Sequence, residues 1–165
     1  MLLGALALRY LVRNERLSRA LLVGLPAIDL LLLIFTTVDL HRGAIASFAH
    51  GLAAAYVGFT VAFGGMAVRW TDAHFAHRFG AGPAPPKAPS QGWQAVRYDL
   101  NLWARCILAC LITVALVEVL VMFTGQGETT RPLLVWHKHA LGCIAVWFVF
   151  GPVWSLATAA WRRPH

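Results

Sequence analysis

The chain has 165 residues, of which 59% are hydrophobic, and its mean hydropathy is +0.64. A small water-soluble domain does not carry so apolar a composition, so helices that span a bilayer are the expected content. The net charge of +7 comes with arginines that flank the apolar runs, which membrane topology and anionic lipid headgroups explain better than nucleic acid does. The composition therefore predicts a single all-α membrane domain over residues 1–165 that lies in the lipid bilayer and binds no nucleic acid.

The first half of the chain predicts a surface helix followed by a helical hairpin. Residues 1–19 are apolar but too short to span a bilayer, and their arginines favour a helix at the cytoplasmic interface. Residues 20–69 predict two spans, joined by a turn near 39–43 that is too short for anything but an antiparallel hairpin. We expect the second span, about 43–69, to lie at the centre of the bundle.

Small residues form a continuous stripe along this second span, at steps of three or four positions. Such a stripe lets a neighbouring backbone approach closely, so we expect it to face another helix of the chain. If it faces lipid instead, it predicts the interface of a homo-oligomer or a membrane complex. The stripe consists of Ser47, Gly51, Ala54, Gly58, Ala62 and Gly65.

The second half of the chain predicts a cytoplasmic connection and a second hairpin. Residues 70–101 begin as an amphipathic continuation of the second span, pass through a glycine- and proline-rich loop, and end in a tryptophan-anchored interfacial helix. Residues 102–160 predict two further spans, about 102–123 and 134–159, with a kink at a Gly-Pro pair. Residues 161–165 form a basic cytoplasmic tail.

Arginine and lysine are distributed unequally between the two sides of the predicted bundle. Eleven lie in or beside the N-terminal segment, the middle connection and the tail, whereas three lie in or beside the two hairpin turns. Because cytoplasmic loops of membrane proteins are enriched in these residues, we expect both termini and the middle connection in the cytoplasm.

The two predicted hairpins align with each other when one is shifted by 89 positions. Five pairs of like ionisable residues then coincide without a gap, which predicts a tandem repeat. Both hairpins start on the same side, so we expect a four-helix bundle of two parallel repeats, related by a pseudo-two-fold axis along the membrane normal. The matched pairs are Arg16 with Arg105, Asp29 with Glu118, Asp39 with Glu128, Arg42 with Arg131, and His50 with His139.

The repeat predicts a buried polar cluster inside the membrane. Asp29 and His50 lie on either side of the first turn at similar distances from it, so they reach a similar depth. Glu118 and His139 lie in the same way about the second loop. Ionisable groups in hydrocarbon are costly without a partner, so we expect the four side chains to converge near the bundle axis. His137 is a poorer candidate, because residues two positions apart on a helix point to nearly opposite faces.

Three functions compete for this cluster. The acids and histidines can lock the helices together in a medium without water, as in a non-catalytic structural or partner-binding subunit. They can instead hold a cofactor, with His50 and His139 as axial ligands of a b-type haem, or with all four side chains around a divalent metal ion. A proton relay is the third function, because histidine beside a carboxylate is suited to proton transfer.

A membrane enzyme that acts on a lipid-soluble substrate is a further alternative, with Asp29 or Glu118 as a general acid. The sequence has no Ser-His-acid pattern and no phosphate-binding glycine loop, so the pattern leans away from catalysis. No catalytic residue is therefore assigned.

Two other groups carry weaker signals. Asp72, His74 and His77 lie at the cytoplasmic edge, where two histidines three positions apart share a helical face and form a weak candidate for a metal site. The cysteines have no C-x-x-C spacing and are odd in number, so neither a disulfide framework nor a cysteine zinc site is indicated. The cysteines, which we interpret as small buried hydrophobic residues, are Cys106, Cys110 and Cys143.

Two segments resemble a known group of proteins. The segments are Phe48-Ala-His-Gly-Leu-Ala-Ala-Ala-Tyr-Val-Gly-Phe59 and Arg69-Trp-Thr-Asp-Ala-His-Phe-Ala-His-Arg-Phe79. They are similar to segments of small four-span bacterial membrane proteins, the YmcC-like group. This resemblance implies a four-helix membrane fold and a location in the inner (plasma) membrane of a bacterium, and it implies no activity.

Overall fold

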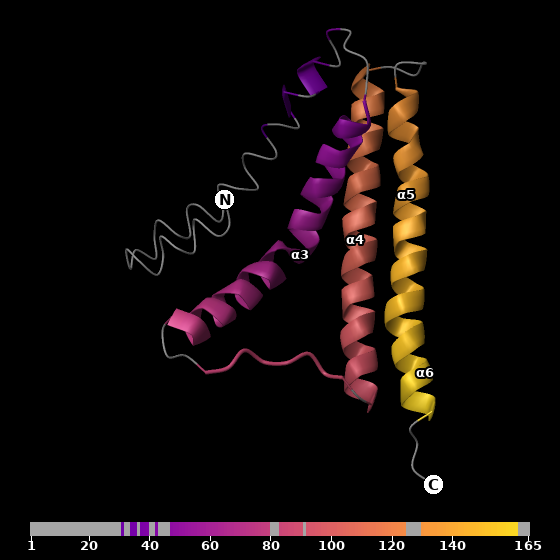
Figure 1. Ribbon diagram of the computed structural model, residues 1–165. Helices are drawn as coiled ribbons and strands as arrows, with labels where there is room; N and C mark the ends of the chain where they lie inside the picture. The colour runs from indigo at the N-terminus through magenta and orange to yellow at the C-terminus, as the bar shows by residue number, and fades with distance from the viewer. Residues whose placement is uncertain are drawn as a thin grey trace.

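The structure, a computed structural model, describes residues 31, 34–35, 37–39, 42, 47–79, 83–90, 92–124 and 130–161. The regular elements in this part of the chain are helical, which confirms the all-α class. They are α3 (Phe48–Phe79), α4 (Gly92–Thr124), α5 (Arg131–Phe148), the π-helical turn η1 (Val149–Val153) and α6 (Trp154–Trp161). The α5–η1–α6 rod stands beside α4, and the first half of α3 packs against α4 as well (Figure 1).

Three of these helical stretches are long and apolar enough to cross a membrane. They are Phe48–Arg78, Gly92–Thr124 and Arg131–Trp161, and they correspond to the second, third and fourth predicted spans. Their outer surface carries many large hydrophobic side chains, including Met122, Phe150 and Trp161, which are 86%, 75% and 92% exposed. Such a surface is typical of helices that face lipid.

Several predicted parts lie outside the described residues. These are the surface helix 1–19, most of the first span 20–38, and the tail after Trp161. The four-span bundle and its internal repeat therefore stay predictions. The turn after the first span is described in part: the N–H of Arg42 donates to the carbonyl of Val38 at 3.1 Å.

The interfacial helix predicted before the third span is not a separate element. α4 is continuous from Gly92 to Thr124. At about 1.5 Å per residue, a helix of this length reaches about 50 Å, well beyond a hydrocarbon core of about 30 Å. α3 likewise continues without a break through 70–79, as the sequence predicts. Both helices are therefore longer than the apolar layer is thick, so their ends can extend beyond it.

The small-residue stripe of α3 faces α4 and α5. A Cβ atom added to Gly58 would lie 2.6 Å from Oγ1 of Thr113, and one added to Gly51 would overlap the indole ring of Trp136. Helices approach this closely only where glycine removes the side chain from the contact. The middle of the stripe is thus covered by helices of the same chain.

α4 occupies the central position that the sequence analysis assigns to the second span. In the most apolar 18-residue window of each stretch, 39% is buried in α4, against 22% in α3 and 17% in the α5–α6 rod. Among the described helices, the prediction of a central second span is therefore wrong. The physical reason is that α4 presents small buried residues to both α3 and α5. These residues are Cys106, Ala109, Cys110 and Thr113.

A polar tie joins α3 to α4. Nη1 of Arg105 donates to the carbonyl oxygen of Ala62 at 2.9 Å, and Nε of the same guanidinium donates to Oδ1 of Asn101 at 3.1 Å. Ala62 lies near the middle of α3, and the second half of α3 diverges from α4 (Figure 1). Arg105 therefore holds the half of α3 that stays in contact with α4.

The predicted kink in the last span is a π-helical turn. η1 contains Pro152, which is buried and has no N–H to donate, so the regular α-helical ladder cannot continue through it. The wider π turn accommodates the ring, and α5 and α6 keep nearly the same direction along α4 (Figure 1).

Candidate metal centre

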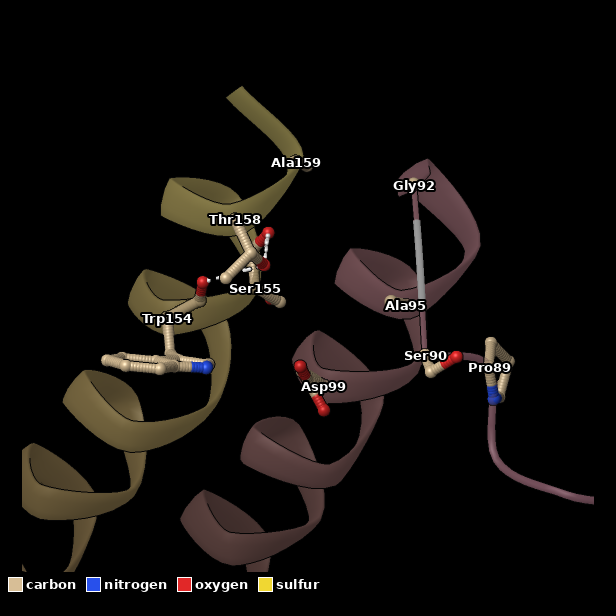
Figure 2. Close-up of a pocket in the computed structure, with 9 residues that line it drawn as sticks. All are labelled: Pro89, Ser90, Gly92, Ala95, Asp99, Trp154, Ser155, Thr158 and Ala159. Atoms are coloured by element: carbon tan, nitrogen blue, oxygen red, sulfur yellow. Dashed lines mark hydrogen bonds between the residues drawn. The ribbon is translucent and has the colours of Figure 1, made fainter. Parts of the chain in front are cut away.

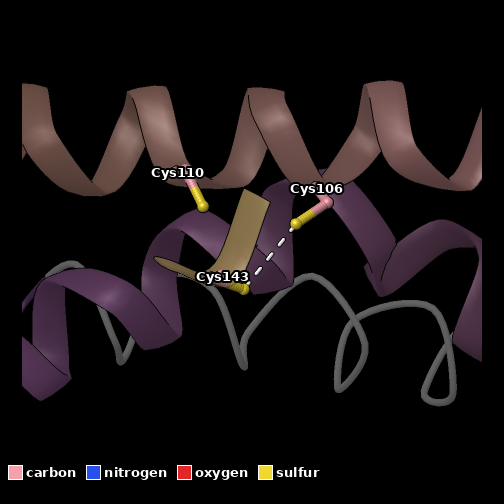
Figure 3. A group of neighbouring side chains, drawn as sticks. All are labelled: Cys106, Cys110 and Cys143. Carbon is pink, nitrogen blue, oxygen red and sulfur yellow. Dashed lines mark hydrogen bonds between the residues drawn. The ribbon is translucent and has the colours of Figure 1, made fainter. Parts of the chain in front are cut away.

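Three cysteines converge between α4 and α5. Cys106 and Cys110 lie one turn apart on α4 and point toward Cys143 of α5 (Figure 3). The three sulfur atoms all lie within 4.8 Å of one another, and Sγ of Cys106 lies 3.7 Å from Sγ of Cys143. All three are free thiols, and Cys106 and Cys110 are buried. In the part of the chain that the structure describes, this is the one group of three potential metal ligands.

The local sequence explains why the sulfurs meet. Residues four apart on a helix share a face, so Cys106 and Cys110 present both sulfurs to the same neighbour. Ala140 lies nearly one turn before Cys143 on α5 and packs into the same cluster. Its small side chain allows α5 to come close to α4. Large apolar side chains then surround the thiols, among them Phe63 and Trp147.

The spacing of the sulfurs fits a metal ion. Sulfurs about 2.3 Å from a zinc ion lie about 3.8 Å apart in tetrahedral geometry. Sγ of Cys106 and Sγ of Cys143 lie 3.7 Å apart and all three sulfurs lie within 4.8 Å of one another, so a small change of side-chain rotamer brings all three to one ion. The sequence analysis, which interpreted these cysteines as small buried hydrophobic residues, missed this cluster.

A cavity of about 160 Å³ adjoins the cysteines. Cys110, Cys143 and Thr113 line it, together with His139. Nδ1 of His139 lies 2.9 Å from the carbonyl oxygen of Val135, which can only accept, so Nδ1 carries a proton and Nε2 is left as the ring nitrogen with a lone pair. His139, one of the four predicted site residues, therefore belongs to the surroundings of the thiols.

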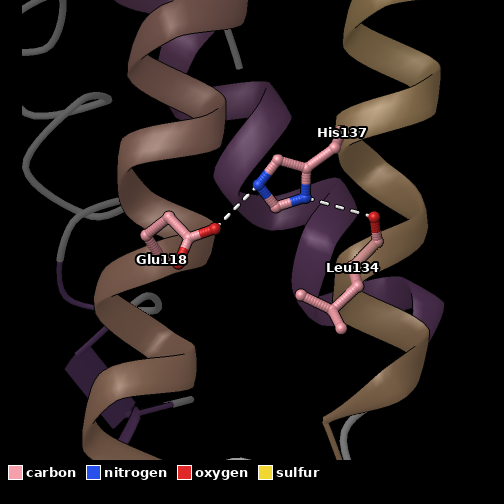
Figure 4. Close-up of polar contacts among 3 residues, drawn as sticks. All are labelled: Glu118, Leu134 and His137. Carbon is pink, nitrogen blue, oxygen red and sulfur yellow. Dashed lines mark hydrogen bonds and ion pairs between the residues drawn. The ribbon is translucent and has the colours of Figure 1, made fainter.

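Glu118 pairs with His137, the histidine that the sequence analysis considered the poorer candidate. Oε1 of Glu118 lies 2.7 Å from Nε2 of His137, and Nδ1 of His137 lies 3.1 Å from the carbonyl oxygen of Leu134 (Figure 4). His137 thus faces α4, whereas His139 packs against Phe48 of α3, with ring centroids 6.0 Å apart. The contact expected between Glu118 and His139 is replaced because α5 is rotated to bring His137 toward Glu118.

The Glu118–His137 contact joins α4 to α5 through side chains that are 55% and 34% exposed. The carbonyl of Leu134 only accepts, so its contact with Nδ1 of His137 requires a hydrogen on that nitrogen. Nε2 is then the ring nitrogen that meets the carboxyl group of Glu118.

His50 lies in the first turn of α3. Its Nδ1 accepts from the backbone N–H of Ser47 at 2.9 Å and lies 2.8 Å from the Ser47 hydroxyl oxygen. Asp29, its predicted partner, lies outside the described residues. Glu118 and His139 are both exposed, so no buried cluster of acids and histidines is seen in the described part of the chain. The four-residue site stays a prediction.

The weaker cytoplasmic candidate lies on the second half of α3. Nδ1 of His74 lies 2.8 Å from the carbonyl oxygen of Trp70, and the two rings are 4.0 Å apart. Asp72 and His77 do not form a three-ligand group with His74 within the described residues. A metal site at this edge therefore has no structural support of the kind that the cysteines have.

Comparison with known proteins identifies one clear relative. The chain is 33% identical over 157 residues to a protein of Bacillus subtilis (strain 168) named "Uncharacterized membrane protein YmcC". The match covers 94% of this chain and 80% of the relative. No protein-family model matches the chain, and no solved structure matches it.

Proposed function

The chain belongs to the family of the membrane protein YmcC, and we propose that it is a multi-pass bilayer protein. We propose further that it binds a thiophilic divalent metal ion, with Zn²⁺ as the first candidate. The observation that carries this proposal is the convergence of three cysteine sulfurs from two helices within 4.8 Å of one another. Thiolate ligands select soft or borderline ions such as Zn²⁺ and Cu⁺ over Mg²⁺ or Ca²⁺. The site would lie between α4 and α5.

The apolar surroundings favour a divalent over a monovalent ion. Three thiolates carry a net charge of −1 with a divalent ion and −2 with a monovalent one, and an uncompensated charge in such a site costs several kcal/mol. On binding, three S–H bonds break, three metal–sulfur bonds form and three protons leave. Nε2 of His139, in the adjoining cavity, is a candidate fourth ligand of neutral charge.

Ligands on both α4 and α5 would make the ion a clamp between two membrane-spanning helices. An ion that binds only the folded arrangement stabilises it by mass action, by about 2.7 kcal/mol at a free concentration 100 times Kd. This points to a structural or metal-sensing role without catalysis. The haem alternative has less support, because Nδ1 of His50 accepts from the N–H of Ser47, which leaves the ring hydrogen on Nε2, the nitrogen that an axial histidine would offer to iron.

The test is elemental analysis of the detergent-purified full chain, compared with its Cys106→Ser, Cys110→Ser, Cys143→Ser triple variant. The chain has three cysteines, so the triple variant is free of thiols. Its seven histidines are already potential ligands, and an affinity tag without histidine avoids adding more. We expect about one metal ion per chain, lost in the triple variant and retained in a His74→Ala, His77→Ala control. Equal metal content in wild type and triple variant would contradict the proposal.

A second candidate function is proton transfer through the Glu118–His137 pair. The 2.7 Å contact between a carboxyl group of α4 and an imidazole of α5 supports it, because such a pair is suited to proton transfer. Proton flux into liposomes that contain the full chain tests this function. We expect flux that a Glu118→Gln variant abolishes and that the cysteine-free variant keeps. Absence of flux in the wild-type protein would leave the pair with a packing role alone.

We also propose that the chain crosses the inner membrane of a bacterium four times, with both termini in the cytoplasm. The distribution of arginine and lysine, eleven against three, supports this orientation. Reporter fusions within 83–90 and within 125–129 test it. A reporter that is active only outside the cytoplasm should be inactive at the first position and active at the second, and the reverse result would overturn the orientation.

A further inference from the structure

A second cavity, separate from the cysteines, lies at the end of the bundle where residues 83–90 lead into α4. Its volume is about 720 Å³, and it lies between the first turns of α4 and the last turns of α6 (Figure 2). Sites for small molecules have volumes of about 300–1,000 Å³. Its polar lining includes the side chains of Asp99, Ser155 and Thr158.

Three of the polar side chains that line this cavity, beside the Ser90 hydroxyl and the Trp154 indole, offer hydrogen-bond acceptors. The Ser155 hydroxyl donates to the carbonyl of Pro152 at 3.1 Å, and the Thr158 hydroxyl donates to the carbonyl of Ser155 at 3.0 Å. Each hydroxyl has only one hydrogen, so its remaining capacity is to accept. The carboxylate of Asp99 accepts only, and in Figure 2 it points across the gap toward α6, the helix that carries both hydroxyls. A ligand group that lies among these three side chains must donate to them.

The lining provides no positive charge to Asp99. Among the described residues, no lysine or arginine lines the cavity. Arg97 is two positions from Asp99 and so projects from nearly the opposite face of α4. A half-buried carboxylate in apolar surroundings is stabilised by an ion pair, so a ligand with a positive charge would balance the negative charge of Asp99.

Aromatic residues place this cavity at the level of lipid headgroups. Trp93 in the first turn of α4 and Trp154 and Trp161 of α6 are 60%, 67% and 92% exposed. Exposed tryptophans gather at membrane–water interfaces, where the ring is partly apolar and its N–H is hydrated. The indole of Trp154 also lines the cavity, and an aromatic ring attracts a cation over its face.

We propose that this cavity binds the ammonium group of an aminophospholipid such as phosphatidylethanolamine. The three N–H groups of a primary ammonium match the three acceptor side chains, and its charge matches Asp99. The volume exceeds that of a lone ammonium group, which leaves room for the remainder of a headgroup. The headgroup level of the cavity favours a bilayer lipid over a soluble amine.

The test is native mass spectrometry of the delipidated full chain in detergent, titrated with phosphatidylethanolamine, with phosphatidylglycerol of the same acyl chains, and with free ethanolamine. The net charge of +7 attracts the anionic phosphatidylglycerol, so a preference for phosphatidylethanolamine cannot arise from overall charge. We expect that preference in the wild-type protein. We also expect Asp99→Asn to weaken phosphatidylethanolamine binding at least about tenfold, while Asp72→Asn leaves it unchanged.

Each remaining outcome overturns the proposal or part of it. Equal binding of the two lipids, or an Asp99→Asn variant that binds like wild type, would remove the ammonium site. Free ethanolamine that binds as tightly as the lipid would overturn the assignment to a headgroup. Circular dichroism checks that Asp99→Asn is folded, and if it is not, a Ser155→Ala, Thr158→Val variant replaces it, with an expected loss of several-fold.

Discussion

Gly58 of α3 and Thr113 of α4 approach so closely that no side chain fits between the two helices. A Cβ atom at position 58 would lie 2.6 Å from Oγ1 of Thr113 and 2.5 Å from the carbonyl oxygen of Ala109. The Thr113 hydroxyl is itself held by a 2.8 Å hydrogen bond to that carbonyl. One of the two obstacles is backbone, which cannot turn aside as a flexible side chain can.

We therefore expect Gly58→Ala to destabilise the protein by about 1–3 kcal/mol, the usual cost of overpacking a tight contact. Thermal unfolding in detergent measures the loss. Gly64→Ala is the matched control on the same helix, because its Cβ atom would lie 3.7 Å from Cγ2 of Thr60, an ordinary contact. Equal stability of the two variants would show that α3 does not pack on α4 through Gly58.

The Glu118–His137 contact predicts a measurable coupling between α4 and α5. In a double-mutant cycle of Glu118→Gln and His137→Ala, we expect a coupling energy of about 0.5–1.7 kcal/mol, the range found for polar contacts between membrane helices. The same cycle with His139→Ala should give a coupling near zero, since His139 faces α3 instead. A larger coupling with His139 than with His137 would contradict the observed rotation of α5.

The level of a residue along a helical hairpin can be read from the sequence, whereas the rotation of a helix about its own axis cannot. Positions equally far from a turn reach the same level, which is why the sequence pairs Glu118 with His139, but the structure places Glu118 against His137 instead. His137 and His139 differ in depth by only about 3 Å but point in nearly opposite directions. The choice between them depends on side-chain packing across the interface, for which hydropathy gives no signal.

The same depth argument, applied to other residues, would have found the cysteines. Cys110 and Cys143 are nearly equally far from the loop between α4 and α5, as Glu118 and His139 are. Cys106 precedes Cys110 by one turn and adds a third sulfur on the same face. The search for C-x-x-C spacing missed this pattern, because that spacing describes sites in loops rather than sites between helices. The small residues of α4 were equally visible in the sequence. That they pack against α3 on one side and α5 on the other, which makes α4 the central described helix, could not be predicted from it.

Metal binding to the three thiols should weaken as the pH falls. Free cysteine has a pKa of about 8.5, so each thiol must lose a proton to bind, and protons compete with the metal below that pH. We expect the apparent affinity for Zn²⁺ to fall at least about tenfold between pH 8 and pH 7, with a net release of protons on binding. Titrations in buffers of different ionisation enthalpy measure the proton count. A pH-independent affinity would indicate ligands other than thiols.

Arg105 predicts how α3 responds when its tie to α4 is cut. Its guanidinium joins the carbonyl of Ala62 to the side chain of Asn101, at 2.9 and 3.1 Å. Replacing it by alanine leaves the carbonyl to its intrahelical partner alone and removes a bridge of two charge-assisted hydrogen bonds. The first half of α3 retains its packing through Gly58, so the loss should be local.

We accordingly expect Arg105→Ala to speed amide hydrogen exchange in the turns of α3 around Ala62 by about tenfold or more, since a charge-assisted hydrogen bond contributes about 1.5–3 kcal/mol. Exchange in α4 and α5 should stay unchanged. Arg97→Ala, an exposed arginine of the same helix, is the matched control and should exchange like wild type. Hydrogen–deuterium exchange with mass spectrometry in detergent resolves these segments. Faster exchange throughout all three helices would show instead that Arg105 supports the whole bundle.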